Sequence, residues 1–175
     1  MITYLDEASF DVPAREALLD RAFGQSRFLK SSERIRSGRL PAEGLSLVAK
    51  DGDRLVGTVR LWHVAAGFGG ADALLLGPLA VAEDARGTGV GAALMRIAIG
   101  RAQEAGHRAI LLVGDEPYYR RFGFSAAPTA GLAMPGPFER HRFLALELEP
   151  GVLTGATGIL RPTGQVAAVA EVLAA

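Results

Sequence analysis

The residues best suited to chemistry lie in one stretch of the sequence, Leu79–Phe124. It contains the glycine-rich segment Arg86–Gly91, which reads Arg-Gly-Thr-Gly-Val-Gly and stands between an expected strand and an expected helix. Glycines at such a junction let backbone N–H groups converge on one small space, where the positive end of the helix dipole also favours an anion. Arg86 adds a permanently charged guanidinium. The pattern predicts a phosphate-binding site; the alternative is a tight turn whose glycines only help a helix to pack.

Groups that could move a proton flank this segment. Glu83 and Asp84 precede it, and Asp115 and Glu116 follow the next expected strand. Each carboxylate could deprotonate an ammonium group, directly or through water. Tyr119 could act as an acid, because an ordinary phenol titrates near pH ~10 and is protonated at neutral pH. The competing interpretation is structural, with solvated carboxylates at helix starts and a tyrosine packed in the core.

Composition narrows the function classes. The chain has 175 residues, with 19 basic and 19 acidic side chains, three histidines and no cysteine. The absence of cysteine excludes disulfides, thiolate metal sites and a cysteine nucleophile, and the histidines lack ligand spacing, so we expect no metal. Balanced charge argues against nucleic acid or a membrane surface as partner. With no signal-peptide pattern and no apolar run of the ~18 residues that a membrane span needs, we expect a cytoplasmic domain.

Apolar spacing and turn residues predict the elements that position these groups. The expected strands are Ile2–Leu5, two strands from Leu45 to Val64 that turn at Asp51-Gly52-Asp53, Ala73–Val81, Ala109–Val113 and Arg142–Leu148. The expected helices are one that Asp11 caps and Gly24 follows, then Ser32–Ser37, Thr88–Ala105, Pro117–Phe122 and an amphipathic tail helix, Gly164–Ala175. This order predicts an α+β fold with a mixed sheet.

Two strands carry further detail. In the second strand of the hairpin, alternation puts Val56, Thr58, Arg60 and Trp62 on one face and Leu55, Val59 and Leu61 on the other. The run Ala73–Val81 is apolar enough for a central strand covered on both faces. Its Gly77-Pro78 pair predicts a local bulge or loss of pairing, because proline has no N–H to donate.

A dinucleotide site is a rival interpretation of the glycines. Gly87, Gly89 and Ala92 also satisfy G-x-G-x-x-A, and Asp115 lies where a ribose-binding acid could stand. Against it, polar residues separate the expected strand from the first glycine, and the chain offers too few βα units for a doubly wound sheet.

Arg86–Gly91 resembles the R/Q-x-x-G-x-G/A motif of the GNAT superfamily of acetyl-CoA-dependent N-acetyltransferases. Leu79-Ala80-Val81 resembles the family's central strand, and Tyr118–Phe124 (Tyr-Tyr-Arg-Arg-Phe-Gly-Phe) resembles its downstream Y-x-x-x-G-F element. The variant Gly114–Phe124 is similar to a bacterial subgroup of largely predicted acetyltransferases. The resemblance covers most of residues 1–149, which we expect to form the acetyltransferase domain, with 150–175 as an extension of it.

The resemblance implies a mostly antiparallel central sheet, flanked by helices and splayed between Leu79–Val81 and Ala109–Val113. The implied cofactor is acetyl-CoA, as co-substrate, and no metal. Its pyrophosphate would bind Arg86, Gly87, Thr88, Gly89, Val90 and Gly91, and its pantetheine arm would bind the backbone of Leu79, Ala80 and Val81. Tyr119 aligns with the tyrosine that protonates the departing thiolate, and Glu83, in the loop before the motif, is the second residue predicted to be catalytic.

The implied activity is direct transfer of an acetyl group to a primary amine on a small molecule or a protein, by a chain that could be a homodimer. A catalytically silent acyl-CoA-binding regulatory module is the alternative. The sequence does not specify the acceptor. The basic cluster Arg27, Lys30, Arg34, Arg36 and Arg39 could attract an acidic acceptor, or form the solvated face of a short helix.

Overall fold

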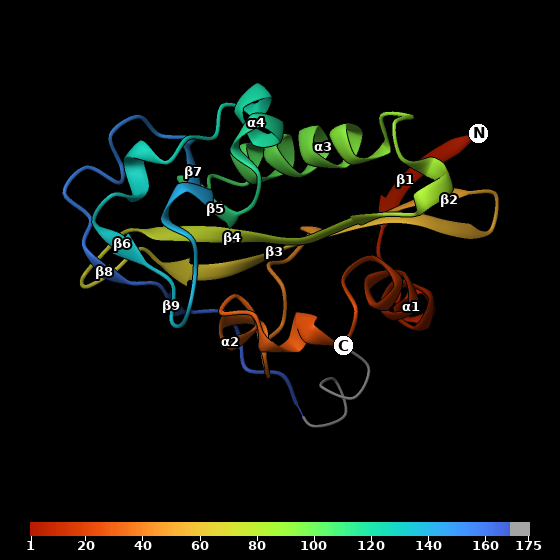
Figure 1. Cartoon of the computed structure of the whole chain (residues 1–175), viewed down its shortest axis with the longest axis horizontal. Coiled ribbons are helices and arrows are strands. Elements are labelled where there is room, and N and C mark those ends of the chain that lie inside the picture. Colours follow the sequence, from red (N-terminus) through yellow and green to blue (C-terminus); the bar gives the residue numbers. More distant parts are fainter. Residues whose placement is uncertain (169–175) are drawn as a thin grey trace.

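A seven-stranded mixed sheet forms the centre of the chain, of which the computed structural model describes residues 1–168. Its strand order is β1-β2-β3-β4-β5-β7, with β9 paired to β3 (Figure 1). All neighbouring pairs are antiparallel except β4 with β5, which confirms the α+β class and the mostly antiparallel sheet. The strands are β1 (Ile2–Asp6), β2 (Ser46–Asp51), β3 (Arg54–Ala65), β4 (Asp72–Val81), β5 (Ala109–Val113), β7 (Phe143–Glu147) and β9 (Arg161–Pro162).

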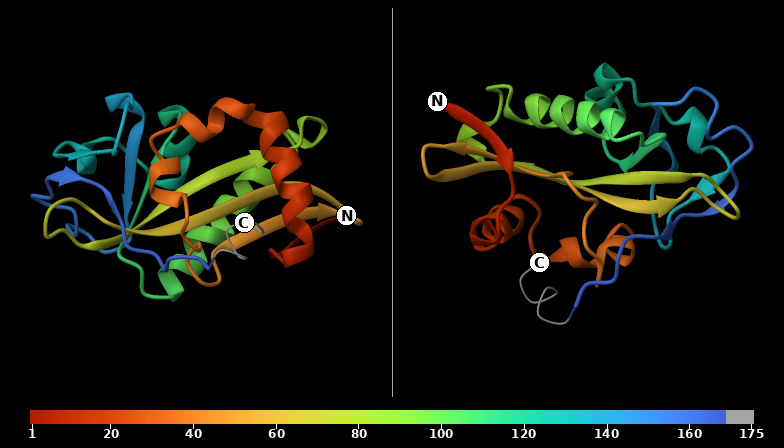
Figure 2. Two further views of the ribbon diagram at one scale, coloured as in Figure 1. Left: turned by 90° about the horizontal axis from the view of Figure 1, so that it is seen from below. Right: turned by 180° about the vertical axis from the view of Figure 1, so that it is seen from behind.

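Helices cover both faces of this sheet. Figure 1 and the right-hand view of Figure 2 show α1 and α2 on one face and α3 and α4 on the other. The helices are α1 (Val12–Phe23), α2 (Glu33–Arg36), α3 (Val90–Glu104) and α4 (Glu116–Tyr119). A separate small sheet pairs β6 (Leu132–Ala133) with β8 (Gly158–Ile159). Within residues 1–168, no helix combines the length and apolarity that crossing a membrane requires.

Two apolar layers hold the helices to the sheet. On one face, α3 packs on the sheet through an apolar stripe in which Val90, Leu94 and Ala98 are buried. Gly57 of β3 lets α3 approach closely, because a Cβ there would stand only 2.9 Å from Val90 Cγ1. On the opposite face, Leu18 of α1 belongs to a smaller buried cluster that also covers the far side of β4.

The face assignment along β3 was wrong at its beginning. The register between β2 and β3 shifts where Ala49 pairs with Gly57 but Lys50 pairs with Leu55, so Val56 is an extra residue in β3. Such a bulge reverses the alternation on one side of it. Leu55 therefore lies in the α1 cluster and Val56 in the α3 core, opposite to the prediction.

The predicted irregularity at Gly77-Pro78 is confirmed. The register between β3 and β4 shifts between Val59 and Leu61, and a cis peptide bond joins Gly77 to Pro78. The buried indole of Trp62 donates a hydrogen bond to the Gly77 carbonyl oxygen, at 2.7 Å. On its other side, β4 pairs with β5 only at Leu74 and Leu75. Beyond Leu75 the two strands separate, as the expected splay requires.

Two predictions about the chain ends need correction. Asp11 precedes α1 but makes no side-chain hydrogen bond to that helix; its carboxylate accepts from the Ala8 N–H and pairs with Lys50. The part of the predicted tail helix that the structure describes, 164–168, is extended, because its backbone hydrogen-bonds to residues 38–40 instead. The rest of that predicted helix lies outside the described residues.

Candidate active site

A cavity of about 940 Å³ lies where β4 and β5 separate. Its walls include Leu76 and Gly77 from β4, and Leu112 and Val113 from β5. The beginning of α3 and the tyrosines of α4 line it from one side of the sheet, and the segment from α1 to α2 lines it from the other. The cavity at this gap therefore extends from the predicted anion site, at Arg86–Gly91, to the predicted proton donor, Tyr119.

The glycine-rich segment forms the turn that leads into α3. Gly87 and Gly89 have φ values of 77° and 92°, in the left-handed region that glycine adopts without strain. Gly89 is the N-cap residue, and no side chain caps the first turn of α3. The Thr88 hydroxyl donates to the Ala85 carbonyl oxygen within the turn, at 2.6 Å. The first backbone N–H groups of α3 therefore point outward without a side-chain acceptor, as an anion site needs.

The predicted cofactor residues do not all face the same space. Arg86 and Gly91 line the cavity, whereas the Val90 side chain is buried beneath α3 in the core. On β4, Leu79 and Val81 line the cavity, but Ala80 is 4% exposed and packs against α1 on the far face. For Ala80, only the backbone is available to a ligand in the cavity.

Tyr119 lines the cavity from the end of α4. Its ring packs edge-on against Tyr118 and Phe124, at centroid distances of 4.9 and 6.0 Å. Burial, followed by the nearby Tyr118 and Asp115, raises the pKa of Tyr119 from 10.0 to about 12. Its hydroxyl makes no hydrogen bond within the part of the chain that the structure describes. The phenol is thus a protonated donor in a cavity, as well as part of the aromatic packing.

The structure separates Glu83 from this arrangement. Glu83 and Asp84 are exposed and line a different hollow, beside Arg54, and Asp84 pairs with Arg54 at 2.7 Å. Glu116 also lies outside the cavity lining and pairs with Arg120 at 2.7 Å. Asp115 is the one carboxylate among these candidates that lines the cavity.

Sequence reasoning missed three residues of the cavity. Gly114, directly after β5, lies against the Tyr119 ring. Glu139 and Arg142 come from the segment before β7, and Arg142 lies within 3.4 Å of Asp115 and 3.7 Å of Glu139. No motif marks Glu139 or Arg142; only the pairing of β7 with β5 brings them to the cavity. The position of Gly114 at the end of an apolar strand was a usable signal.

The basic cluster divides into two groups. Arg27, Lys30 and Arg36 line the cavity. Arg34 and Arg39 do not; they donate hydrogen bonds to the Pro135 and Gly164 carbonyl oxygens.

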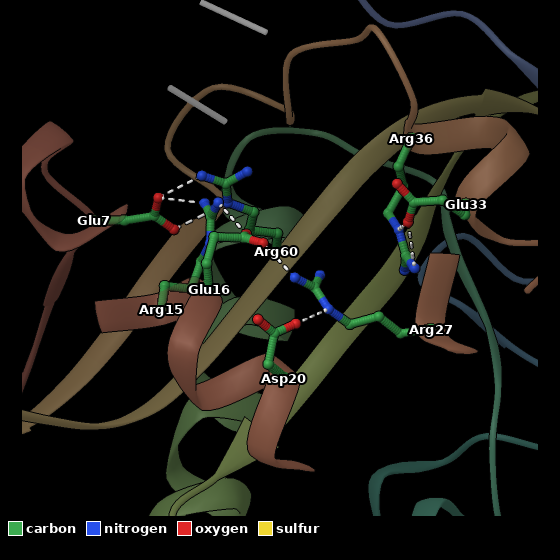
Figure 3. A network of polar contacts seen from close by, with 8 residues as sticks. All are labelled: Glu7, Arg15, Glu16, Asp20, Arg27, Glu33, Arg36 and Arg60. Atoms are coloured by element: carbon green, nitrogen blue, oxygen red, sulfur yellow. Dashed lines mark hydrogen bonds and ion pairs between the residues drawn. The ribbon is translucent and has the colours of Figure 1, made fainter. Parts of the chain in front are cut away.

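Acidic side chains hold part of this cluster in place, as Figure 3 shows. Arg27 binds Asp20 at 3.0 Å and also pairs with Glu16. Nearby, the Glu7 side chain is 4% exposed and binds both Arg15 and Arg60, which ties α1 to β3. Burial raises the pKa of Glu7 despite these two arginines.

Comparison with known proteins gives a consistent family assignment. The sequence profile of the acetyltransferase (GNAT) domain matches residues 42–126. The uncharacterized N-acetyltransferase YhbS of Escherichia coli K12 is 30% identical over 156 residues, which are 88% of this chain and 92% of the relative. The uncharacterized N-acetyltransferase YjhQ of the same strain is 32% identical over 146 residues, 77% of this chain and 79% of that protein.

Solved structures agree with the sequence relatives. E. coli YhbS in complex with CoA has a TM-score of 0.76 and 30% identity, covering 92% of this chain and 89% of that chain. A GNAT family acetyltransferase from Brucella melitensis in complex with acetyl-CoA has a TM-score of 0.67 and 25% identity. The match covers 92% of this chain and 95% of that chain. The mostly antiparallel sheet of this chain is not the doubly wound sheet that the dinucleotide interpretation needs. The chain belongs to the GNAT family and is an N-acetyltransferase.

Proposed function

We propose that the protein transfers an acetyl group from acetyl-CoA directly to the nitrogen of a primary amine. One observation carries the proposal: a single cavity, between β4 and β5, is lined by the start of α3 at one end and by Tyr119 beside the strand opening. Direct transfer needs both substrates in one such space. The absence of cysteine also removes the most familiar acyl-enzyme route.

The donor end of the cavity is the turn Arg86–Gly91. Here the uncapped N–H groups of α3 and the Arg86 guanidinium would bind the coenzyme pyrophosphate. The pantetheine arm would run along the unpaired edge of β4, where the backbone of Leu79, Ala80 and Val81 has no β5 partner. The neighbours solved with CoA and acetyl-CoA support this choice of donor.

The reaction forms one bond and breaks another. The neutral amine attacks the thioester carbonyl carbon, the C–N bond forms, and the C–S bond breaks as the intermediate collapses. The attacking nitrogen loses a second proton to solvent as it becomes the amide nitrogen. Tyr119 gives its phenolic proton to the departing sulfur and regains one from solvent, and its raised pKa keeps that proton available. The proton of the acceptor ammonium goes to Asp115 or Glu139, through water, because these carboxylates line the cavity and Glu83 does not.

Two pairs of variants test this proposal. Arg86→Gln should weaken CoA binding, measured by calorimetry, whereas Arg96→Gln, on the exposed side of α3, should bind CoA as the parent does. Tyr119→Phe should lower kcat by roughly ten- to a few-hundred-fold at unchanged CoA affinity, and Tyr118→Phe should stay near parental activity. Turnover is followed as free CoA thiol with a panel of primary amines.

Each result separates the proposal from its rivals. Normal turnover by Tyr119→Phe would remove the tyrosine from the chemistry. CoA binding without turnover of any amine would favour the silent regulatory module. Parallel double-reciprocal plots, with an isolable acetylated enzyme, would replace direct transfer by a relay through a side chain.

A further inference from the structure

The charge around the cavity differs from that of the whole chain. The sequence has as many acidic as basic residues. Among the described residues, however, the cavity is lined by five cationic side chains and by only the two carboxylates Asp115 and Glu139. Arg86 belongs to the α3 end. The other four come from two parts of the chain: Arg27, Lys30 and Arg36 from the segment from α1 to α2, and Arg142 from the segment before β7.

Arg36 is the most enclosed of the cations that are free to bind a ligand. Its side chain is 10% exposed, and its Nε and Nη2 both donate to one oxygen of Glu33, at 3.3 and 3.2 Å. Its Nη1 instead lies beside the strand opening, 3.5 Å from the place where a Cβ would stand on Gly77. Burial lowers the pKa of Arg36, which shows that Glu33 offsets only part of the cost of enclosing this charge.

Lys30 and Arg142 add positive charge next to Arg36. Lys30 forms no ion pair with any residue in 1–168; its ammonium lies 4.5 Å from the centre of the Phe23 ring. Burial and then the charges of Arg36 and Arg142 lower the pKa of Lys30, so both arginines lie close enough to repel the Lys30 ammonium. Arg142 lies at ion-pair distance from Asp115 and Glu139, 3.4 and 3.7 Å, but its buried Nε donates no hydrogen bond in the described structure. A nearby anion would satisfy these donors and remove the repulsion.

The remaining cation of the group is already neutralised. Arg27 is held by Glu16 and Asp20, as Figure 3 shows, so it contributes little free donor capacity. The anion site therefore consists of Arg36, Lys30 and Arg142. Arg36 and Lys30 belong to the segment from α1 to α2, which lies on the sheet face opposite α3 (Figure 1), so we expect the phosphates at the Arg86–Gly91 turn not to fill this site.

We propose that the acceptor amine carries an anionic group, a carboxylate or a phosphate, which Arg36, Lys30 and Arg142 bind while the amine lies beside Tyr119 and the strand opening. This inference rests on the proposed acetyl transfer and names the class of its second substrate. Polyamines and other purely cationic acceptors are excluded by the same charges, because they would be repelled from this end of the cavity.

Matched amines test the acceptor class. The panel pairs α-amino acids with their α-amides, O-phosphoethanolamine with ethanolamine, and peptides with Glu at the second residue with the same peptides carrying Gln; spermidine is the cationic control. The anionic member of at least one pair should have the higher kcat/KM, by roughly ten- to a hundred-fold, as expected for one or two charge-assisted hydrogen bonds. The pair that shows the preference distinguishes carboxylate from phosphate.

Variants test whether the site of Arg36, Lys30 and Arg142 causes the preference for anionic acceptors. Lys30→Gln should raise KM for the anionic acceptor roughly tenfold with kcat little changed, because a contact made before and during reaction changes binding uniformly. Lys30→Arg should keep the preference. Arg34→Gln removes a charge from the same segment but outside the cavity, and should behave as the parent. Arg36→Gln should remove most of the preference; Lys30→Gln still decides the question if Arg36→Gln folds poorly.

A binding measurement on CoA-saturated protein does not depend on turnover. The N-acetylated form of the preferred anionic acceptor, or N-acetylglycine if none is acetylated, should raise the melting temperature more than its neutral amide does. Equal use of neutral and anionic amines would overturn the inference and leave acetyl transfer standing. No turnover of any amine would overturn the proposed function, and with it the acceptor assignment, even if the carboxylate binds.

Discussion

Gly114 and Tyr119 lie in direct contact: a Cβ on residue 114 would stand 2.3 Å from Cε2 of the tyrosine ring. Gly114 follows β5 immediately, and Tyr119 is the last residue of α4. A residue without a side chain is therefore what allows the ring to lie beside the opening of the sheet.

Gly114→Ala should displace the Tyr119 ring. We expect kcat to fall by roughly ten- to a hundred-fold, because small displacements of a reacting group cost that much, while CoA affinity stays near that of the parent. Gly100→Ala in α3 is the control, since a Cβ there meets nothing within 4 Å. Activity retained in Gly114→Ala would show that the position of the ring does not matter for catalysis.

The raised pKa of Tyr119 predicts an unusual alkaline behaviour. The folded chain keeps this phenol neutral up to about 12, whereas the unfolded chain ionises it near its ordinary value of 10.0. The stability that Tyr119 contributes is thus complete below its ordinary pKa and is lost as pH rises towards 12. A near-ultraviolet phenolate titration of the parent and Tyr119→Phe should assign the last-titrating of the three tyrosines to Tyr119. If the parent loses activity near 10.0, the ordinary phenol pKa, and Tyr119→Phe does not, the raised pKa of Tyr119 is contradicted.

The buried pair of Asp11 and Lys50 should anchor the chain before α1. Its oxygen–nitrogen distance is 2.6 Å, and the two side chains are 6% and 14% exposed. Asp11→Ala should destabilise the fold by about 3 kcal/mol, because Lys50 is left buried without its partner. Asp84→Ala, which breaks an exposed pair with Arg54, should change the melting temperature little.

Low pH should remove the stability that the Asp11–Lys50 pair contributes. Burial acts to raise the pKa of Asp11, but hydrogen bonds from Lys50 and the Ala8 N–H outweigh it, so the pKa lies below the ordinary 3.8. The stabilisation is present above that ordinary value and is lost as pH falls through the lowered pKa. Urea titrations should therefore show a larger acid loss in the parent than in Asp11→Asn; equal losses would refute the pairing.

The neighbours Ile159 and Leu160 offer a matched test of whether the segment after residue 150 belongs to the folded core. Leu160 is 1% exposed and packs in a further buried cluster, with Leu75 of β4 and Leu111 of β5, whereas Ile159 is 44% exposed. Leu160→Ala should cost about 2–5 kcal/mol, and Ile159→Ala should cost less than about 1 kcal/mol. Equal effects in chemical denaturation would mean that 150–168 is not part of the domain.

Much of the fold could be predicted because long apolar runs and turn residues specify it locally. Ala109–Val113 matches β5 at both ends, and the Asp51-Gly52-Asp53 turn matches the β2–β3 hairpin. Leu55 and Val56 were assigned to the wrong faces because a bulge depends on the partner strand, which alternation within β3 cannot report. The two-residue strands β6, β8 and β9 are too short to show any period.

The candidate site also contains residues that the sequence could predict and residues that it could not. Arg86–Gly91 and Tyr119 could be predicted because a motif marks each. Glu83 is adjacent to the motif in sequence but faces another hollow, since the turn before α3 points it away. The gathering of Lys30, Arg36 and Arg142 depends on tertiary structure, because residues from opposite ends of the chain meet only after β7 pairs with β5.

The pairing of β9 with β3 also bears on how the protein is made. Val64 and Ala65, at the end of β3, pair on one side with β4, but on the other side they pair with Pro162 and Arg161, almost a hundred residues later. During synthesis from the amino terminus, the central strand therefore emerges from the ribosome long before the segment that covers its edge. The end of β3 therefore has one open edge while almost a hundred further residues are made, and this part of the sheet closes only after β9 has been synthesised.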